Sequence, residues 1–302
     1  MSVLTKAYFH DEAAAFAKLE EIVWPHGPSC PHCGGMERVY DLSKTRLGLK
    51  KCGHCRKQFT VRVGTVFESS HVPLHKWFQA VFLLASSKKG ISAHQLHRTL
   101  EVTYKTAWFM AHRIREAMRS GELAPMGGNG KFVEVDETFI GRDKTKKPKG
   151  QKKGRGYAHK FKVLTLVERE GKARSMVVDD LKTSTIVPIL RENIDRETRV
   201  MTDEAGQYAH LSRDFEHGFV SHGKGEYGRG EVHTNTIEGY FSIFKRGMKG
   251  TYQHCAEKHL HRYLAEFDFR YNNRVALGIE DQERATVALR GIVGRRLMYR
   301  DS

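Results

Sequence analysis

The chain has 302 residues and a formal charge of +16 at pH 7, because 51 Lys and Arg outnumber 35 Asp and Glu. Its length predicts about two domains with a sizeable core, and its charge indicates a polyanionic partner, above all nucleic acid. The longest uncharged apolar run, residues 77–87, is too short to cross a bilayer, and the first residues lack the basic-then-apolar pattern of a signal peptide, so we expect a cytoplasmic protein with reduced thiols.

An amphipathic helix is expected in the N-terminal segment, residues 1–24. Phe16, Leu19 and Ile22 recur at helical spacing and form one apolar stripe, and Pro25 ends the pattern. The segment therefore reads as a helix that precedes the cysteine-rich region.

Four cysteines form two CxxC pairs that are separated by eighteen residues. In a reducing compartment this spacing predicts one structural, tetrahedral Zn²⁺ per chain, and the alternative is two disulfides or unrelated thiols. Short strands around the pairs would complete a zinc ribbon over residues 25–65, with Gly34, Gly35 and Gly53 allowing the tight turns. The expected zinc ligands are Cys30, Cys33, Cys52 and Cys55. The fifth cysteine, Cys255, is expected to be a small buried hydrophobic residue.

Residues 70–120 have helical periodicity. Ser92 and Gln95 form a capping box before a short helix that runs to Leu100, and Thr103 caps a second helix that ends near Met118. Two short helices joined by a tight turn are typical of a helix-turn-helix, although a plain helical hairpin explains the same pattern. The second helix carries the basic residues Lys105, Arg113, Arg115 and Arg119, and its first residues Tyr104, Lys105 and Thr106 are the candidates for base contacts.

A strand with acidic residues follows the glycine-rich linker at 121–130. Residues 132–140 have the β-branched and aromatic content of a strand, and alternation places Glu134 and Asp136 on one face and Glu137 on the other. A carboxylate on a central strand needs compensation, which a divalent cation supplies, so Asp136 is a candidate metal ligand. The alternative is an edge strand with a solvated acidic face.

A dense basic segment, residues 144–155, comes directly after this strand and contains seven Lys and Arg. It is expected to clamp DNA phosphates through residues such as Lys147 and Lys152, while a simple solvated loop is the alternative.

Further strands are expected at 161–169, 173–178 and 198–203, with a helix at 185–193 before the last of them. This β-β-β-α-β order predicts a mixed α/β, ribonuclease-H-like domain over residues 130–275. In that fold Asp136 and Asp203 lie on neighbouring central strands, so their carboxylates should meet.

A final helix begins near residue 235 and carries Glu238 and Lys245 two turns apart on one face. Asn235 and Glu238 also have capping-box spacing, so both residues could serve helix initiation alone. The basic and helical segment 276–302 is given no role.

Residues 133–141, 200–204 and 233–252, followed by 257–274, resemble the catalytic domain of ISXO-like DDE transposases from bacterial insertion sequences. The four-cysteine ribbon is the usual companion of that domain, and the resemblance covers roughly residues 20 to 275. It implies that Asp136 and Asp203 are the first two metal-binding acids. Glu238 is the third, because Lys245 lies at the expected offset from it, with Asn235 as the fallback.

The resemblance also implies chemistry and partners. Two Mg²⁺ or Mn²⁺ ions would be held by Asp136, Asp203 and Glu238 during hydrolysis and strand transfer, without a covalent protein intermediate. The expected partner is double-stranded DNA, both terminal repeats and target, bound by a nucleoid-associated homodimer or higher oligomer. Lys245, Arg246, Lys249, Lys105, Lys147 and Lys152 are the expected DNA contacts.

Two other functions fit parts of the pattern. A regulator with a zinc ribbon, a helix-turn-helix and an inactive nuclease-like domain would bind DNA without cutting it. A metal-dependent nuclease would cut without strand transfer.

Overall fold

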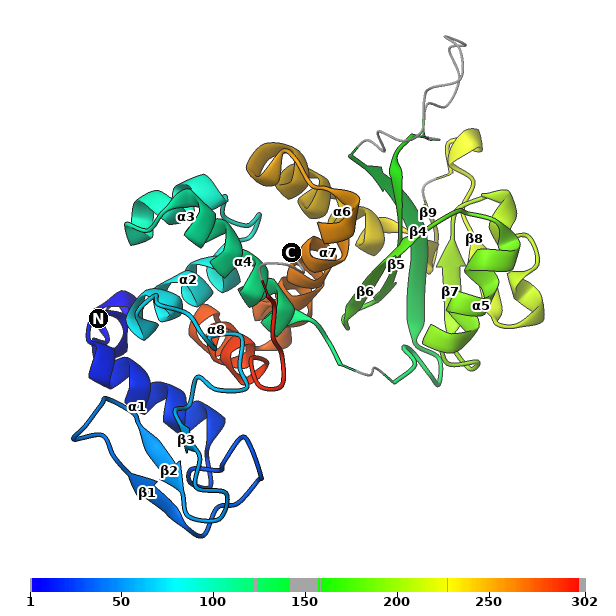
Figure 1. Cartoon of the computed structure of the whole chain (residues 1–302). Helices are drawn as coiled ribbons and strands as arrows, with labels where there is room; N and C mark the ends of the chain where they lie inside the picture. The colour runs from blue at the N-terminus through cyan, green and yellow to red at the C-terminus, as the bar shows by residue number, and fades with distance from the viewer. Residues whose placement is uncertain (1, 122–123, 142–156, 158, 227, 299–302) are drawn as a thin grey trace. The chain divides into compact units, whose positions relative to one another are not determined.

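A computed structural model describes residues 2–121, 124–141, 157, 159–226 and 228–298. The chain divides into two compact units, Met1–Arg119 with Gly278–Ser302, and Ser120–Leu277 (Figure 1). Within the described part of the chain, no helix has both the length and the apolarity that crossing a bilayer requires.

The first unit begins with the expected helix and a small antiparallel sheet. Helix α1 (Glu12–Val23) starts at Asp11, whose carboxylate accepts a hydrogen bond from the backbone N–H of Ala14. The three strands pair in the order β1-β2-β3 and bring the two CxxC segments together. They are β1 (Val39–Asp41), β2 (Lys50–Cys52) and β3 (Gln58–Phe59).

The rest of the first unit is helical. It contains α2 (Leu74–Ser86), α3 (Ala93–Leu100), α4 (Tyr104–Met118) and α8 (Asp281–Arg290). Ser92 and Thr103 cap α3 and α4 as predicted, and Glu101 turns the chain between these helices at φ 52°. Helix α8 packs against α1, α2 and α4, so part of the segment left without a role completes this helical core.

Two arginines of α4 do not lie on an exposed DNA-facing surface. Arg113 and Arg115 are buried, and the Arg113 guanidinium donates to the carbonyls of Val66, Glu68 and Leu297. Because a buried guanidinium needs such acceptors, Arg113 holds the N-terminal and C-terminal parts of this unit together. The expectation that these two arginines belong to a basic recognition helix is wrong, while Tyr104 and Lys105 are exposed and Thr106 is half-buried.

The second unit is built on a five-stranded mixed sheet with the order β6-β5-β4-β7-β8. Strands β4, β5 and β6 are antiparallel neighbours, and β4, β7 and β8 run parallel. Helix α5 (Thr183–Asn193) connects β6 to β7, so the predicted β-β-β-α-β order and the ribonuclease-H-like fold are confirmed. The strands are β4 (Phe132–Ile140), β5 (Phe161–Glu168), β6 (Ala173–Val178), β7 (Arg199–Thr202) and β8 (Glu216–Phe219).

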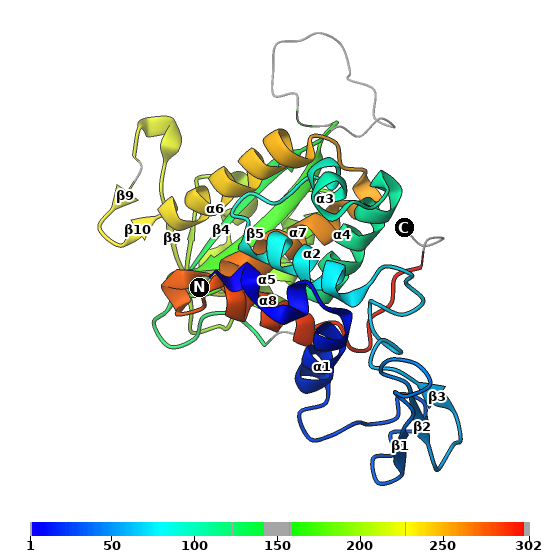
Figure 2. The same cartoon turned by 90° about the vertical axis from the view of Figure 1, so that its left-hand side faces the viewer.

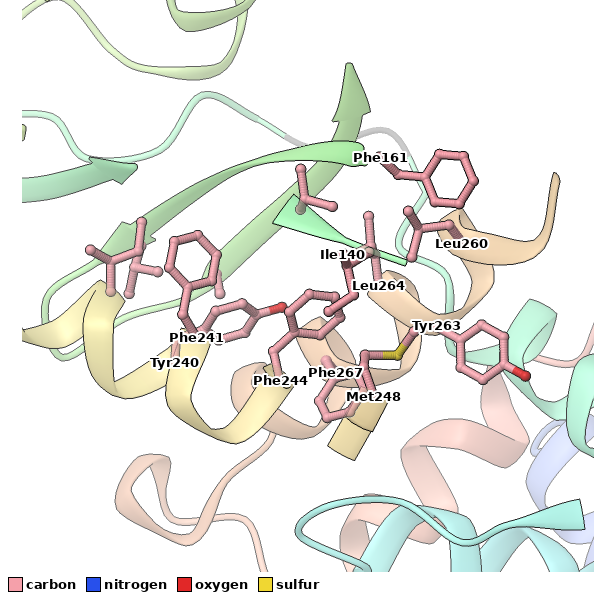
Figure 3. Close-up of a cluster of buried hydrophobic side chains, with 14 residues drawn as sticks. Ile140, Phe161, Tyr240, Phe241, Phe244, Met248, Leu260, Tyr263, Leu264 and Phe267 are labelled. Carbon is pink, nitrogen blue, oxygen red and sulfur yellow. The ribbon is translucent and has the colours of Figure 1, made fainter. Parts of the chain in front are cut away.

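Helices cover both faces of this sheet. Helix α5 lies on one face, and α6 (Asn235–Arg246) and α7 (Glu257–Asn272) lie on the other (Figure 1). Val133 and Val135 pack with Leu164 and Leu166 in the core on the α5 face. On the opposite face Ile140, Val163 and Val167 meet the aromatic side of α6 and α7 (Figure 3).

Several short elements complete the second unit. A small hairpin, β9 (Gly228–Arg229) and β10 (Val232–His233), precedes α6, and a π-helix, Gly247–Tyr252, follows it directly. The short 3₁₀ turns of the chain are Val3–Thr5, Ala7–Phe9, Gly206–Tyr208, Leu211–Arg213, His222–Lys224 and Val275–Leu277.

Candidate active site

Asp136 and Asp203 lie side by side at the centre of the sheet. The parallel register pairs Val133 with Val200 and Glu134 with Met201. Continuing it by two residues sets Asp136 opposite Asp203, and residues paired in this way point to the same face of a sheet. The sequence prediction that the fold brings these two acids together therefore agrees with the register.

The electrostatics of Asp136 reflect this crowding. Burial, the Glu137 carboxylate and the Asp203 carboxylate together raise the pKa of Asp136 to about 8. The backbone N–H of Glu137 and the Lys245 ammonium act in the opposite direction but do not compensate. A carboxylate with a pKa this far above its usual range gains strongly from a nearby cation, so the position is suited to a divalent metal.

Glu137 points to the α5 face, as the alternation predicts, yet its charge interacts with those of Asp136 and Asp203. Its carboxylate accepts hydrogen bonds from the Tyr208 hydroxyl, at 2.6 Å, and from the Gln207 side chain. Burial and Asp203 raise the pKa of Glu137, while these hydrogen bonds lower it. Glu137 therefore adds negative charge beside Asp136 while its own position is fixed by two neighbours.

Glu134 is a buried carboxylate whose role the sequence analysis missed. It is fully buried, it pairs with the Arg169 guanidinium at 2.7 Å, and it accepts hydrogen bonds from Thr236 Oγ1 at 3.0 Å and from the Ile237 backbone N–H at 2.9 Å. Arg169 also donates to the carbonyl of His233. Glu134 thus accepts a hydrogen bond from an N–H at the start of α6 that has no partner within the helix. Because Glu134 lies two residues before Asp136 on β4, this contact fixes the start of α6 next to the acid pair.

This arrangement replaces the capping box expected at the start of α6. Thr234 is the N-cap residue and makes no side-chain cap, Asn235 is the first helical residue, and Glu238 lies beyond the capping position. The capping-box alternative for Asn235 and Glu238 is therefore wrong. The signal in the sequence was a second acid, Glu134, two residues from Asp136 on the same face of an otherwise apolar strand, since such an acid needs a partner if it is buried.

The Glu238 carboxylate points toward the segment before its helix. It is 49% exposed, accepts a hydrogen bond from Thr234 Oγ1 at 3.2 Å, and lies 3.6 Å from His222 Nε2. Asn235 is exposed. Within the described residues the four cysteines are the only group of three or more potential metal ligands whose donor atoms lie within 4.8 Å of one another. The structure thus brings Asp136 and Asp203 together, whereas Glu238 does not join them in such a cluster.

The basic residues of α6 lie along the same region. Lys245 is exposed, lies over the Phe241 ring at 5.5 Å, and is close enough to Asp136 to lower the pKa of that carboxyl. Arg246 and Lys249 are exposed, and Arg246 donates to the backbone carbonyl of Ser242. Lys147 and Lys152, the remaining predicted phosphate contacts of this domain, lie outside the described residues.

The second candidate metal centre is the four-cysteine cluster. Cys30 Sγ lies 3.6 Å from Cys55 Sγ, and Cys33 Sγ lies 3.6 Å from Cys52 Sγ. Tetrahedral Zn–S bonds of about 2.3 Å place sulfurs roughly 3.8 Å apart, so this donor set fits zinc. The backbone N–H groups of Cys55 and His54 lower the pKa of Cys52 to about 7, which favours the thiolate that a metal requires. The neighbouring thiols and burial raise the pKa of Cys33 to about 11, so the metal-free cluster shares its protons unequally.

Turn geometry explains why the cysteines converge. Gly34 has φ 76° directly after the first pair, and Arg56 has φ 60° at the equivalent position after the second. Gly53 itself does not have a positive φ. Instead its missing side chain permits close contact with Arg38, whose carbonyl accepts the Gly53 N–H at 2.6 Å.

Two family models match the chain, each over one of the two regions described above. Residues 127–272 match the ISXO2-like transposase domain, and residues 10–58 match the transposase zinc-ribbon domain. The chain is 31% identical over 276 residues to an uncharacterized protein in transposable element ISH50 of Halobacterium salinarum, covering 87% of this chain and 91% of the relative. The chain belongs to the ISXO2-like transposase family. It also resembles an uncharacterized transposase-like protein of Haemophilus influenzae, with 26% identity over 103 residues, 34% of this chain and 82% of the relative.

Family membership covers the residues singled out above. The transposase-domain match contains Asp136, Asp203 and the whole of α6, and the zinc-ribbon match contains all four clustered cysteines. The resemblance to ISXO-like transposases with an N-terminal zinc ribbon is therefore confirmed, and the chain is a transposase-family protein.

Proposed function

We propose that this transposase binds the ends of its insertion sequence and catalyses phosphodiester hydrolysis and strand transfer into target DNA with two divalent metal ions. The proposal is supported by the β4–β7 register, which sets Asp136 opposite Asp203 when it is continued by two residues, and by the effect of the Asp203 charge on the pKa of Asp136, both within the matched transposase domain. Crowded, half-buried carboxylates are poor structural elements but good ligands for hard cations.

Each acid has a distinct part in this proposal. Burial and the Glu137 and Asp203 carboxylates raise the pKa of Asp136 to about 8, and this residue would be a ligand of both ions. Asp203 would be a ligand of one ion, and Glu238 would be a ligand of the other once its side chain turns away from Thr234. When bound, Mg²⁺ or Mn²⁺ would supply an activated water or 3′-hydroxyl and offset the charge on the departing oxygen.

The basic residues of the same domain hold the DNA. Lys245 is exposed, and its positive charge is near enough to Asp136 to lower the pKa of that carboxyl. Its ammonium can therefore bind a phosphate next to the reacting one. Arg246 and Lys249 extend this positive surface, and Lys105 offers a contact in the first unit. The four cysteines hold one structural Zn²⁺ that fixes the ribbon.

The direct test is strand cleavage and joining of a duplex that carries the element's own ends, with Mg²⁺ and the full chain. Asp136→Asn and Asp203→Asn should each lower the rate by at least a factor of about 1,000 while DNA affinity is kept. Asp180→Asn is a matched control, because Asp180 interacts with the first turn of α5 through Thr185 and Lys182. DNA binding without cleavage in the wild type would favour the regulator, and cleavage without joining would favour the nuclease.

The third metal ligand is tested separately. Glu238→Gln should abolish cleavage if Glu238 completes the site, whereas Asn235→Ala should leave most activity. The reverse result, with unchanged helix content, would assign the third position to Asn235.

A further inference from the structure

A cavity of about 490 Å³ opens beside the acid pair in the second unit. It is lined by the end of β4, from Glu137 to Gly141, by Lys245 of α6 and by the π-helix that follows. Its volume lies within the range of about 300–1,000 Å³ that is usual for ligand sites. Because β4 runs from Asp136 directly into this wall, the cavity and the acid pair share one strand.

The cavity combines a cationic rim with apolar and aromatic walls. Lys160, Lys245 and Lys249 contribute the positive charge. Ile140 and Met248, which belong to the buried cluster in Figure 3, contribute apolar surface. Phe139 and Tyr157 stack on each other with ring centroids 4.3 Å apart. A phosphate alone would need only the lysines, so the apolar and aromatic surface indicates a ligand with a flat, apolar part as well.

Two local features indicate that this cavity is built to bind. Gln253 lines the cavity at the centre of a γ-turn, with φ 58° and ψ −53°, and the His254 N–H donates to the Tyr252 carbonyl at 2.6 Å; this conformation is strained for a residue other than glycine. Met248 and Lys249 come from a π-helix, a rare conformation that occurs often at functional sites.

We propose that this cavity binds one nucleotide of the DNA substrate whose base has left the helical stack, next to the phosphate held at the acid pair. The base packs against the apolar and aromatic walls, the Gln253 amide meets its polar edge, and the lysines bind the flanking phosphates. The inference rests on the proposed function, because it places the DNA strand beside Asp136.

Cys255 offers a reporter inside the cavity. It lines the wall, is half-buried rather than fully buried as expected from the sequence, and forms no disulfide. A base in the cavity should shield this thiol from alkylation, whereas a phosphate backbone that only crosses the rim should do so with or without the base.

The first experiment uses the full chain with Asp203→Asn, which should bind DNA without cutting it. A duplex carrying the element's end receives 2-aminopurine at each position beside the cut in turn, since this base fluoresces more brightly when it is unstacked. We expect a several-fold increase at one position. This increase in fluorescence should be lost with Gln253→Gly, because glycine keeps the positive φ of this position but lacks the amide. It should be kept with Gln282→Ala on α8 of the other unit.

The second experiment measures alkylation of Cys255 by peptide mass spectrometry on the same complex. DNA should slow the alkylation several-fold. An abasic site at the position where 2-aminopurine brightens should restore the alkylation rate of the free protein, because the phosphates remain but the base is gone. Equal protection by the abasic duplex would overturn the proposal in favour of a backbone contact only.

The outcomes separate this inference from the proposed function. If no position brightens while the wild type cuts the same duplex, the nucleotide site is wrong and the transposase activity stands. If the wild type does not cut, the activity is wrong, and fluorescence of the bound duplex still decides the cavity. A chain that does not bind the duplex contradicts both.

Discussion

The two candidate metal centres of this protein differ in how complete they are. The four cysteine sulfurs already lie at distances that suit a tetrahedral ion, whereas only Asp136 and Asp203 of the proposed catalytic acids come together. The cysteines belong to two short turns on one small sheet. The acids come from strands and a helix that are far apart in the chain, and they carry like charges.

This difference shows that the free energy needed to bring metal ligands together depends on whether the ligands are charged. Neutral thiols can approach without repulsion, and local backbone N–H groups then favour the thiolate. Burial and the neighbouring carboxylates raise the pKa of Asp136, so a third acid gains little by joining this site without a cation. The catalytic site therefore depends on its scaffold and its cation to close.

The largest effect is expected when a ligand is removed from the four-cysteine centre. Cys52→Ser should release the single Zn²⁺ and unfold the ribbon, because structural zinc contributes an apparent 10–16 kcal/mol, roughly, in small zinc domains. Metal analysis and circular dichroism check this, and Cys255→Ser is the matched control that should keep the metal. A stoichiometric zinc content in Cys52→Ser would show that the four cysteines are not a single site.

A smaller effect is expected at the scaffold of the acid site. Glu134→Gln should lower the free energy of unfolding by about 3 kcal/mol, because it leaves the largely buried Arg169 guanidinium without its carboxylate. Urea denaturation measures the change. Adding Arg169→Gln to Glu134→Gln should recover part of the loss, since no charge then stays buried.

Glu216→Gln provides the comparison for this scaffold variant. It removes the exposed partner of Arg199 and should cost less than about 1 kcal/mol. Equal losses in Glu134→Gln and Glu216→Gln would mean that Glu134 does not fix the start of α6.

The smallest expected effect concerns pH and stability without metal. The pKa of Asp136 is about 8 in the folded chain against 3.8 as the ordinary value, so the folded state holds its proton more tightly. The free energy of unfolding should therefore fall as the pH rises from about 4 to about 8. Asp136→Asn should remove that part of the fall and stabilise the metal-free protein at pH 8 by about 1–3 kcal/mol.

Saturating Mg²⁺ should reverse the order of stability of the wild type and Asp136→Asn at pH 8. The wild type should gain thermal stability at pH 8 and Asp136→Asn should gain little, because it lacks a ligand. A metal-free wild type that is more stable than Asp136→Asn at pH 8 would contradict the electrostatic account of the pair.

The sequence predicted the features that depend on local pattern. Helix caps at Ser92 and Thr103, the strand at 132–140 and the cysteine pairs all follow from neighbouring residues. The sequence also predicted that Asp136 and Asp203 meet, because the strand order of the ribonuclease-H-like fold makes their strands neighbours, and the observed order and register agree with that expectation.

The features that the sequence analysis missed are contacts between distant segments. Glu134 satisfies the start of α6 across 103 positions of chain, and the Arg113 side chain reaches Leu297 across 184. In both, a charged residue is buried because a distant backbone group supplies a hydrogen-bond partner. The capping-box spacing at Asn235 failed for the same reason, since Glu134 takes the position that a local side chain usually takes.

The central claim is that Asp136 and Asp203 hold a common metal ion, and iron-directed cleavage of the chain tests it most directly. Fe²⁺ with ascorbate, used in place of Mg²⁺, cuts a polypeptide beside the residues that bind it. We predict cuts next to both 136 and 203 in the wild type, suppressed by excess Mg²⁺ and lost together in Asp203→Asn. Cuts beside only one of the two residues, or cuts near 136 that persist in Asp203→Asn, would show that the acids do not share a metal.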